Sequence, residues 1–354
     1  MVDISAFFTV ELLIAALAGG AFGAALGALP AFIFTGFMVI AGEAAAYVDA
    51  DAGAITGSIA FGPVFGPHIS FAAGAAATAY AAKKGYIDDP GFDYHDAKDI
   101  GYALGTKPDV LAVGAVFGVV GYWITTLSSQ LALPWDPIAL GVTLSALVHR
   151  VAFGYGIIGD RRTGLLDMSP FESEERRVIG EPGTSDAGGE ATDGGAATAR
   201  FLVEPWLPHQ YKWANVAAIG AVVGVLGAYI AFVTESAFLA FGISAASLVF
   251  LNLGVANIPV THHMSLPAST AALAIVPEGT AVADGPVVAM LLVGALFGLV
   301  CALFGEVFQR VFYAHGDTHW DPPAAAIVFG TLIIGVLALL GVFPSAVWVP
   351  QPAF

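Results

Sequence analysis

Apolar residues fill ten long stretches of this chain, and short polar or Pro- and Gly-rich breaks separate them. A run of about 20 apolar residues can cross a hydrocarbon core of about 30 Å as a helix. The regular alternation of polar and apolar residues that a transmembrane β-strand needs is missing from these stretches. The pattern predicts an all-α polytopic membrane protein with spanning helices at 7–28, 31–48, 54–82, 109–129, 138–157, 212–233, 236–250, 251–276, 286–309 and 323–345.

The first five predicted helices resemble the last five in order, which indicates an internal duplication. The parallel segments are GGAFGAALG (19–27) with IGAVVGVLG (219–227), GPHISFAAG (66–74) with THHMSLPAS (261–269), LAVGAVFGVVG (111–121) with MLLVGALFGLVC (290–301), and WDPIALGVTL (135–144) with WDPPAAAIVF (320–329). Several of them carry glycines at a spacing of four, which lets helices pack closely. The chain divides into a first repeat at 1–157, a linker at 158–211 and a second repeat at 212–354.

Positive charge predicts how the repeats are oriented. If the N-terminus lies outside the cell and the chain crosses ten times, all 12 Lys and Arg fall in cytoplasmic segments or within snorkelling reach of them. Because five is an odd number, the second repeat then runs in the opposite sense to the first. We expect a five-plus-five inverted repeat in the cell membrane, with both termini outside. The acidic linker, 158–211, is expected to be cytoplasmic and partly disordered, because it contains few large apolar residues.

Paired breaks interrupt the third and eighth predicted helices. GPVFGP (62–67) breaks the helix at 54–82, and NIPVTHHMSLP (257–267) breaks the one at 251–276. New half-helices are expected to begin at His68 and near His263. Non-helical backbone survives at membrane depth only where protein or water satisfies it, and in inverted repeats such breaks mark a substrate site at the midplane. The residues expected to line a pore or bind substrate there are His68, Ser70, His262, His263 and Ser265.

Histidine suits such a centre because it can donate, accept or carry a proton near neutral pH. The positive ends of the two half-helices favour a small anion, a carboxylate or a polar neutral solute. Alternatively, each histidine caps a broken helix by bonding a nearby carbonyl, and the sequence leaves both interpretations open.

Other ionisable residues inside predicted helices are candidates for function, because such groups are costly in a membrane. Glu43 is either a proton or cation ligand near the outer mouth or a helix-end residue within reach of water. Glu306 stands four residues before Arg310, which is the favourable order for a helical ion pair. For Arg150 we favour snorkelling to the cytoplasmic surface over an inward position facing an anion.

The loop YAHGDTHWDP (313–322) places His315, Asp317, His319 and Asp321 at a spacing that could suit a divalent metal. Only its Trp-Asp-Pro recurs in the first repeat, at 135–137, where Asp caps the helix that Pro begins. We therefore predict no metal site. The sequence lacks GxxxxGK[ST], HExxH and GxSxG motifs, and it has one cysteine, Cys301, so we predict no cofactor and no enzyme of those types.

Composition supports the membrane class and narrows the partners. The 354 residues are 57% hydrophobic and 11% charged, with a mean hydropathy of +0.80, whereas soluble domains carry about 25% charged residues. The net charge of −16 argues against nucleic acid and anionic lipid as partners. This acidic composition resembles that of proteins from salt-loving archaea.

The five-plus-five plan resembles the urea-channel and ammonium-channel families in topology over the whole chain, although no motif of either family is present. The resemblance implies a permease-like fold and, by analogy, a homo-oligomer, most often a trimer. Ammonium channels carry paired histidines on the fifth helix of each repeat, and here they lie on the third, so that activity is not carried over. We expect a channel or secondary transporter for a small polar or anionic solute, embedded in the lipid bilayer. The alternatives are a non-transporting membrane scaffold and an intramembrane enzyme that uses His and Ser.

Overall fold

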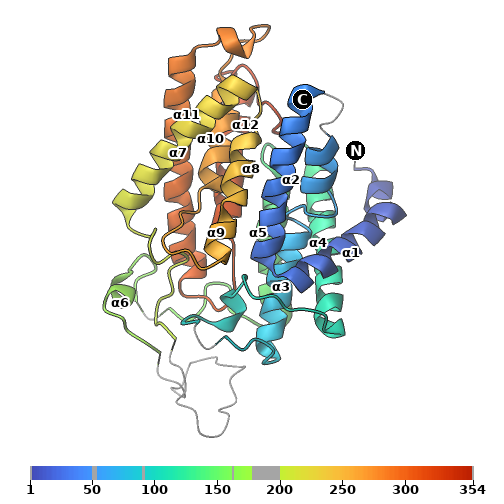
Figure 1. Cartoon of the computed structure of the whole chain (residues 1–354), viewed down its shortest axis with the longest axis vertical. Coiled ribbons are helices and arrows are strands. Elements are labelled where there is room, and N and C mark those ends of the chain that lie inside the picture. The colour runs from blue at the N-terminus through green and yellow to red at the C-terminus, as the bar shows by residue number, and fades with distance from the viewer. Residues whose placement is uncertain (1, 50–53, 90–91, 162, 178–199, 353–354) are drawn as a thin grey trace, which may run out of the picture.

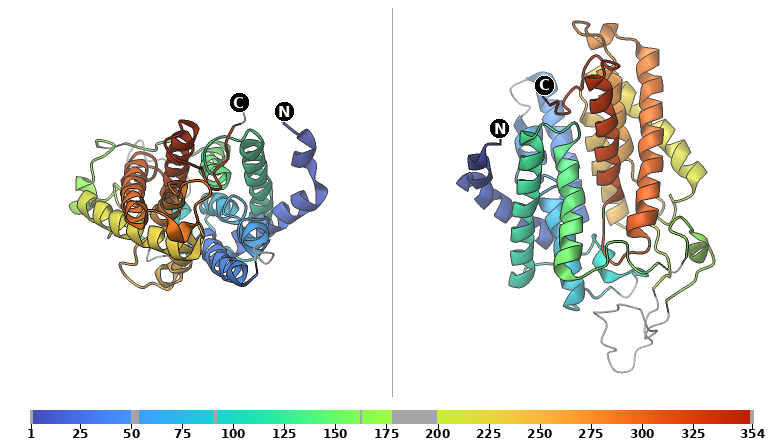
Figure 2. Two further views of the ribbon diagram at one scale, coloured as in Figure 1. Left: turned by 90° about the horizontal axis from the view of Figure 1, so that it is seen from above. Right: turned by 180° about the vertical axis from the view of Figure 1, so that it is seen from behind.

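The computed structural model describes residues 2–49, 54–89, 92–161, 163–177 and 200–352. The described residues form a bundle of helices in which the first half of the chain lies beside the second half (Figures 1 and 2). The helices of the first half are α1 (Val10–Leu26), α2 (Ala28–Val48), α3 (Ser70–Lys83), α4 (Pro108–Gln130) and α5 (Pro137–Phe153). Those that follow are α6 (Ser169–Glu172), α7 (Trp213–Thr234), α8 (Leu239–Ala246), α9 (Leu248–Asn252), α10 (His262–Ala274), α11 (Val287–Phe308) and α12 (Pro322–Leu339).

Five helices are long and apolar enough to cross a membrane: α2, α4, α7, α11 with the π-helical turn η6 (Gln309–Tyr313) that continues it, and α12. Three shorter apolar stretches are α1, α5 and the α8–α9 pair. The 14 residues of α3 and the 13 of α10 extend only about 20 Å at 1.5 Å per residue. These apolar helices fit an integral membrane protein, as the hydropathy pattern predicts.

Both predicted helix breaks are present. In the first half a π-helical turn, η3 (Thr56–Ala60), is followed by irregular backbone until α3 begins at Ser70, two residues later than expected. In the second half α9 belongs mostly to the stretch predicted at 236–250 and ends at Asn252, and α10 begins at His262. The stretch predicted as a broken helix at 251–276 therefore forms a helix only after its break. The stretch predicted as one helix at 236–250 is divided between α8 and α9 at Ser247, whose hydroxyl bonds the Ser244 carbonyl oxygen at 2.7 Å. Side-chain bonding of this kind competes with the regular helix.

Glycines explain how the helices of each half come so close together. A Cβ placed on Gly20 of α1 would lie 2.3 Å from the carbonyl oxygen of Gly114 in α4. One placed on Gly224 of α7 would lie 2.2 Å from that of Gly294 in α11. Neither position has room for a side chain, so the glycine spacing read from the sequence marks two backbone-to-backbone seams.

The two halves repeat the same packing. In the first half α3 packs against α1, α4 and α5, and in the second half α10 packs against α7, α11 and α12. The halves meet where α2 packs on α8 and where α5 packs on α12. The starts of α3 and α10 therefore both lie in the interior, next to the junction between the halves.

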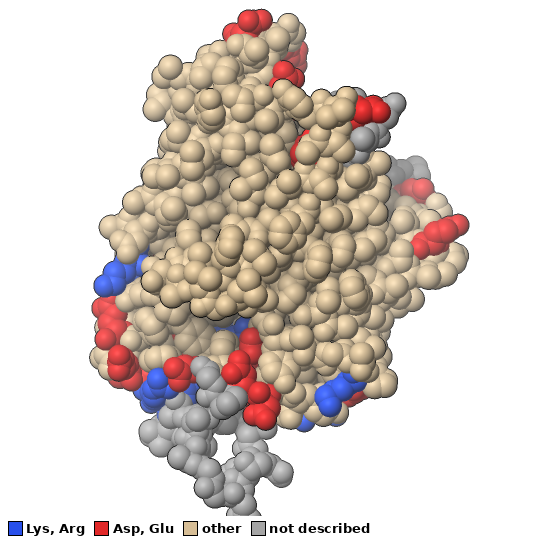
Figure 3. Space-filling model, viewed as in Figure 1, with Lys and Arg blue, Asp and Glu red and all other residues tan. Residues whose placement is uncertain are grey.

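The two ends of the bundle differ in charge. We call the end that carries residues 84–107, 154–177, 200–212 and 309–321 the linker end, and the opposite end the far end. Among the described residues, all Lys and Arg belong to segments at or next to the linker end. Asp and Glu are found at both ends, and the centre of the face shown in Figure 3 carries neither sign.

The linker is folded on both sides of its middle. Residues 163–177, which include α6, and residues 200–211 pack against the linker end, and Val203, Glu204 and Tyr211 are buried there. The backbone N–H of Glu204 donates to the Ala314 carbonyl oxygen at 3.0 Å. The predicted disorder concerns mainly residues 178–199, which lie outside the described residues.

Candidate functional site

A large cavity opens where the two broken helices meet. Its volume is about 1880 Å3, and residues from both halves line it. Phe32 of α2 stands between the two helix starts: its ring centroid lies 5.7 Å from that of Phe71 at the start of α3 and 4.7 Å from that of His262 at the start of α10. We call this space the central cavity.

Two of the predicted histidines, His68 and His262, line the central cavity. Each is only 5% exposed, and the Nδ1 atom of each is buried without a hydrogen-bond partner in the described residues. Glycines of neighbouring helices make room for His68, because a Cβ on Gly121 would lie 1.6 Å from its carbonyl oxygen and one on Gly141 2.8 Å from its Cβ. Buried polar atoms are normally hydrogen-bonded, so an unpaired ring nitrogen on each of two residues that line one cavity marks this region as a candidate polar site.

Three other predicted pore residues do not line the cavity. The hydroxyl of Ser265 bonds the His262 carbonyl oxygen at 3.2 Å, and that of Ser70 lies 3.4 Å from the Gly66 carbonyl oxygen. Both serines pack against glycines of the neighbouring helix, so they serve as small residues at close helix contacts. His263, which the repeat pairs with His68, instead packs on the ring of Trp206 with centroids 5.9 Å apart.

Glu43 lies at the far end and joins three segments. Its two carboxylate oxygens accept hydrogen bonds from Thr56 at 2.7 Å and from Ser236 at 2.5 Å. The residue is half-buried and does not line the central cavity. Its contacts are those of a structural link between α2, the η3 turn and the segment before α8.

Glu306 and Arg310 form the ion pair that their spacing predicts, with Nε and Oε1 2.5 Å apart. Arg310 also donates to the carbonyl oxygens of Leu166 at 2.6 Å and Tyr211 at 2.9 Å. The pair therefore anchors both flanks of the linker to the end of α11.

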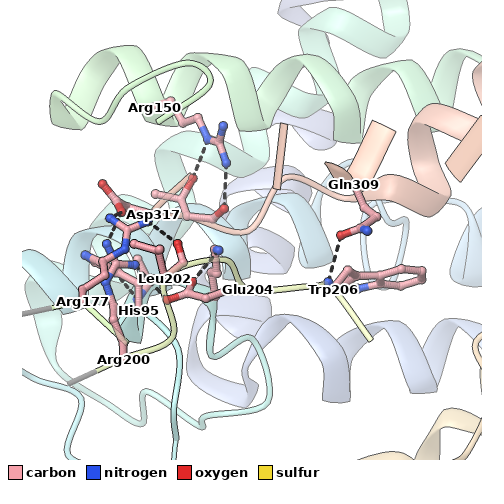
Figure 4. A network of polar contacts seen from close by, with 12 residues as sticks. His95, Arg150, Arg177, Arg200, Leu202, Glu204, Trp206, Gln309 and Asp317 are labelled. Carbon is pink, nitrogen blue, oxygen red and sulfur yellow. Dashed lines mark hydrogen bonds and ion pairs between the residues drawn. The ribbon is translucent and has the colours of Figure 1, made fainter. Parts of the chain in front are cut away.

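Arg150 does not reach solvent, and the favoured expectation that it snorkels is wrong. The side chain is fully buried, and it donates to Thr318 through its Nε and Nη2 atoms, each at 2.8 Å. Its guanidinium carbon lies 4.9 Å from the Trp320 ring centroid, in a cation–π position. Figure 4 shows Arg150 spanning from α5 to the loop before α12. Through these contacts Arg150 holds residues 318–320, which lead into Asp321, against α5.

The two Trp-Asp-Pro sequences cap their helices as predicted. Asp136 accepts from the backbone N–H groups of Ile138 and Ala139, and Asp321 accepts from that of Ala324 at 2.7 Å. Both carboxylates also line the central cavity. The sequence analysis thus predicted the capping contacts of the two aspartates, but it did not predict that they line the central cavity.

The loop from His315 to Asp321 is divided among separate contacts. Asp317 accepts from Arg200 at 2.6 Å, and His319 lies 3.1 Å from the carboxylate of Asp321. The part of the chain that the structure describes contains no group of three or more His, Cys, Asp or Glu placed to hold a metal ion.

The sequence analysis did not predict a buried ionic network, whose residues Figure 4 shows. The network includes Lys98, which lines the cavity near the linker end. Lys98 lies 2.5 Å from Glu204, and both side chains are fully buried. Glu204 also pairs with Arg200 at 3.1 Å, and Arg200 in turn contacts Asp317. Burial lowers the pKa of Lys98 to about 8, although Glu204 opposes this. For Glu204, burial alone would raise the pKa, but the nearby Lys98 and Arg200 outweigh it and leave the pKa lowered.

Acidic residues line the cavity where it reaches the linker end. Asp89, Asp93 and Asp99 all belong to its lining. Burial, followed by the charge of Asp89, raises the pKa of Asp99 to about 6. One carboxylate oxygen of Asp99 is buried and has no hydrogen-bond partner among the described residues. The sequence signal for this group is the acidic run at 88–99, in a loop that connects two apolar helices.

Almost the whole chain matches one known protein family. Residues 1–352 match the family of unknown function DUF7973, so the chain belongs to that family. No curated protein matches the chain, and no solved structure matches it.

Proposed function

We propose that this member of the DUF7973 family is a channel or secondary transporter for a small polar solute. The observation that carries the proposal is the reach of the central cavity. Its lining includes Asp89 and Asp99 at the linker end and Gln130, the last residue of α4, at the far end. Since α4 has 23 residues, these ends are separated by about 34 Å at 1.5 Å per residue, close to the thickness of a bilayer core.

The repeated packing supports a ten-crossing inverted repeat. In this arrangement each half contributes one short helix that begins after non-helical backbone, α3 and α10, and the starts of these two helices meet at the midplane. The restriction of Lys and Arg to the linker end supports a cytoplasmic linker and outer termini, with the protein in the cell membrane.

The lining chemistry supports a polar solute. His68 and His262 belong to the lining, and Asp136 and Asp321 lie at two levels of the cavity. The backbone N–H of Asp136 donates to Thr331 at 2.9 Å, and Thr331 lies about 15 Å along α12 from Asp321. A solute that moves through the cavity therefore meets polar groups at several depths.

The two alternative functions have less support. An intramembrane enzyme using His and Ser needs the imidazole and hydroxyl to be paired, but Ser70 and Ser265 bond backbone carbonyl oxygens and lie outside the cavity lining. A purely structural scaffold gives no reason for a cavity of about 1880 Å3 with buried unpaired polar atoms.

A flux measurement tests the proposal. The protein is reconstituted into liposomes, and stopped-flow light scattering follows the permeation of urea, glycerol, ethanolammonium chloride and sodium acetate. The variant Ala324→Phe places a ring in the cavity lining, and Ala218→Phe places the same ring on an exposed position of α7. We expect at least one solute to enter faster than in empty liposomes, and Ala324→Phe alone to slow it. If no solute enters faster than in empty liposomes, or if the two variants are equivalent, the proposal is wrong.

A further inference from the structure

One flank of the linker runs along the wall of the central cavity. We call residues 200–210 the strap. Leu207 is 7% exposed and belongs to the cluster of buried apolar residues that also contains Phe32 and Phe241. The strap therefore extends from the linker end to the apolar residues around the starts of α3 and α10. The strap residues that line the cavity are Phe201, Trp206, Leu207, Pro208 and His209.

The sequence of the strap suits a segment without regular structure. Apart from one β-bridge residue near its start, the strap is neither helical nor part of a sheet. Pro205 and Pro208 stand on either side of its tip, which consists of Trp206 and Leu207. Proline has no backbone N–H and a fixed φ, so it leaves fewer donors to satisfy in an apolar interior. The N–H of Trp206 donates to the side-chain oxygen of Gln309 at 3.1 Å.

The strap is bonded to both halves of the protein. Toward the first half, the carboxylate of Glu204 pairs with Lys98 at 2.5 Å. Toward the second half, the backbone N–H of Glu204 donates to the Ala314 carbonyl oxygen at 3.0 Å. The side-chain amide of Gln210 donates to the Val260 carbonyl oxygen and accepts from the Val260 N–H, each at 3.0 Å. The strap therefore joins the two halves at the linker end of the cavity.

The bonds of the strap also reach the break before α10. Ile258 and Val260 belong to the non-helical backbone that precedes this helix. Gln210 satisfies both backbone groups of Val260, and the ring Nε2 atom of His209 lies 2.9 Å from the Ile258 carbonyl oxygen. Buried backbone groups that are left out of a helix need such partners. A movement of the strap would therefore release the backbone at the break as well as the apolar tip.

We infer that the strap is the gate of the central cavity at the linker end. Trp206 and Leu207 narrow the passage, and the bonds of Glu204 and Gln210 hold the tip in place. In alternating access one repeat moves against the other, so a segment bonded to both halves has to release before they separate at this end. A segment without regular structure can open locally while the helices around it stay folded. The inference rests on the proposed function, because a gate needs a passage to close.

Side-specific thiol labelling tests the gate. The native Cys301 is fully buried, so an introduced cysteine is the reactive one. The reporter is Thr126→Cys, in the cavity lining near the far end of α4. The whole protein is placed in oriented proteoliposomes, and impermeant sulfonatoethyl methanethiosulfonate is added at the linker side or at the far side. Leu207→Ala shortens the tip, and Leu166→Ala, at an exposed position of the other linker flank outside the cavity lining, is the matched control.

We expect Leu207→Ala to raise the linker-side labelling rate about tenfold or more, because loss of a buried leucine side chain weakens the closed state. The far-side rate should stay unchanged, which also shows that the variant is folded, and Leu166→Ala should change neither rate. Gln210→Leu removes both bonds to Val260 but keeps the tip, and it should raise the linker-side rate in the same way.

Two results overturn the inference and leave the passage intact. In the first, Leu207→Ala and Gln210→Leu leave the linker-side rate unchanged while far-side labelling persists, so the strap is a fixed wall. In the second, both variants raise the two rates equally, so they loosen the whole cavity and not one end of it. If Thr126→Cys is modified from neither side in any background, the cavity is closed to solutes, and the proposed function fails with the inference.

Discussion

Replacing Glu204 by Gln removes the carboxylate that binds both Lys98 and Arg200 in the buried ionic network. Lys98 is fully buried, so its ammonium group cannot turn to water when the partner charge is lost. Breaking a buried pair in this way costs about 3–5 kcal/mol. The cost for Arg200 is smaller, because Asp317 still accepts from it at 2.6 Å. We therefore expect the free energy of unfolding to fall by about 3–5 kcal/mol.

The assay is unfolding in detergent, followed by tryptophan fluorescence against denaturant. Glu278→Gln, on an exposed far-end loop, serves as the matched control and should change stability by less than about 0.5 kcal/mol. In the double variant Lys98→Met, Glu204→Gln the unpaired ammonium is gone, so we expect a recovery of about 1 kcal/mol or more. If Glu204→Gln behaves like Glu278→Gln, the network does not hold the linker end together. If Lys98→Met gives no recovery, the loss does not arise from an unpaired lysine.

Further predictions concern pH, the glycine seams and Glu43. The pKa of Asp99 is raised to about 6 from an ordinary 3.8, so the folded protein binds the proton more tightly and the ionised carboxylate destabilises the fold above about pH 6. Asp99→Asn should thus raise the free energy of unfolding at pH 7, and this gain should disappear near pH 4. A gain of the same size at both pH values would contradict the raised pKa of Asp99. Gly20→Val forces a side chain to within 2.3 Å of the Gly114 carbonyl oxygen and should lower the free energy of unfolding by about 1–3 kcal/mol or prevent folding. If the Gly20→Val protein unfolds like the wild type, α1 and α4 do not pack as closely as described. Glu43→Gln should lower the free energy of unfolding by about 1–2 kcal/mol, because its bonds to the hydroxyls of Thr56 and Ser236 become weaker, and it should leave solute flux unchanged. Loss of flux with normal stability would instead place Glu43 in the transport path.

Features that depend on local chemistry could be read from the sequence. Two prolines and two glycines within six residues, at 62–67, interrupt the helix there, whereas the single Pro267 lies inside α10. The glycine seams and the pair of Glu306 with Arg310 follow from helical spacing alone. The capping role of Asp136 and Asp321 follows from the Trp-Asp-Pro order.

Features that depend on the meeting of distant segments could not be read in this way. Lys98 and Glu204 are 106 residues apart, and nothing in either neighbourhood indicates the other. Pairing of the repeats matched His68 with His263, but the cavity is lined by His262, one residue earlier. A step of one residue turns a side chain by about 100° around a helix, so an alignment of repeats cannot decide which histidine faces inward. Arg150 could not be assigned either, because its partner Thr318 lies in a loop of the other half.

The central claim is that the cavity between the broken helices can be reached from both sides of the membrane. The most direct measurement is side-specific thiol labelling of His68→Cys in oriented proteoliposomes, with an impermeant reagent added outside, inside or to both. Ser70→Cys is the matched control, because Ser70 lies two residues away but outside the cavity lining. The account predicts that His68→Cys reacts from each side and that Ser70→Cys reacts from neither. If His68→Cys is protected from both sides, or reacts no faster than Ser70→Cys, the cavity is not a passage and the transport function is contradicted.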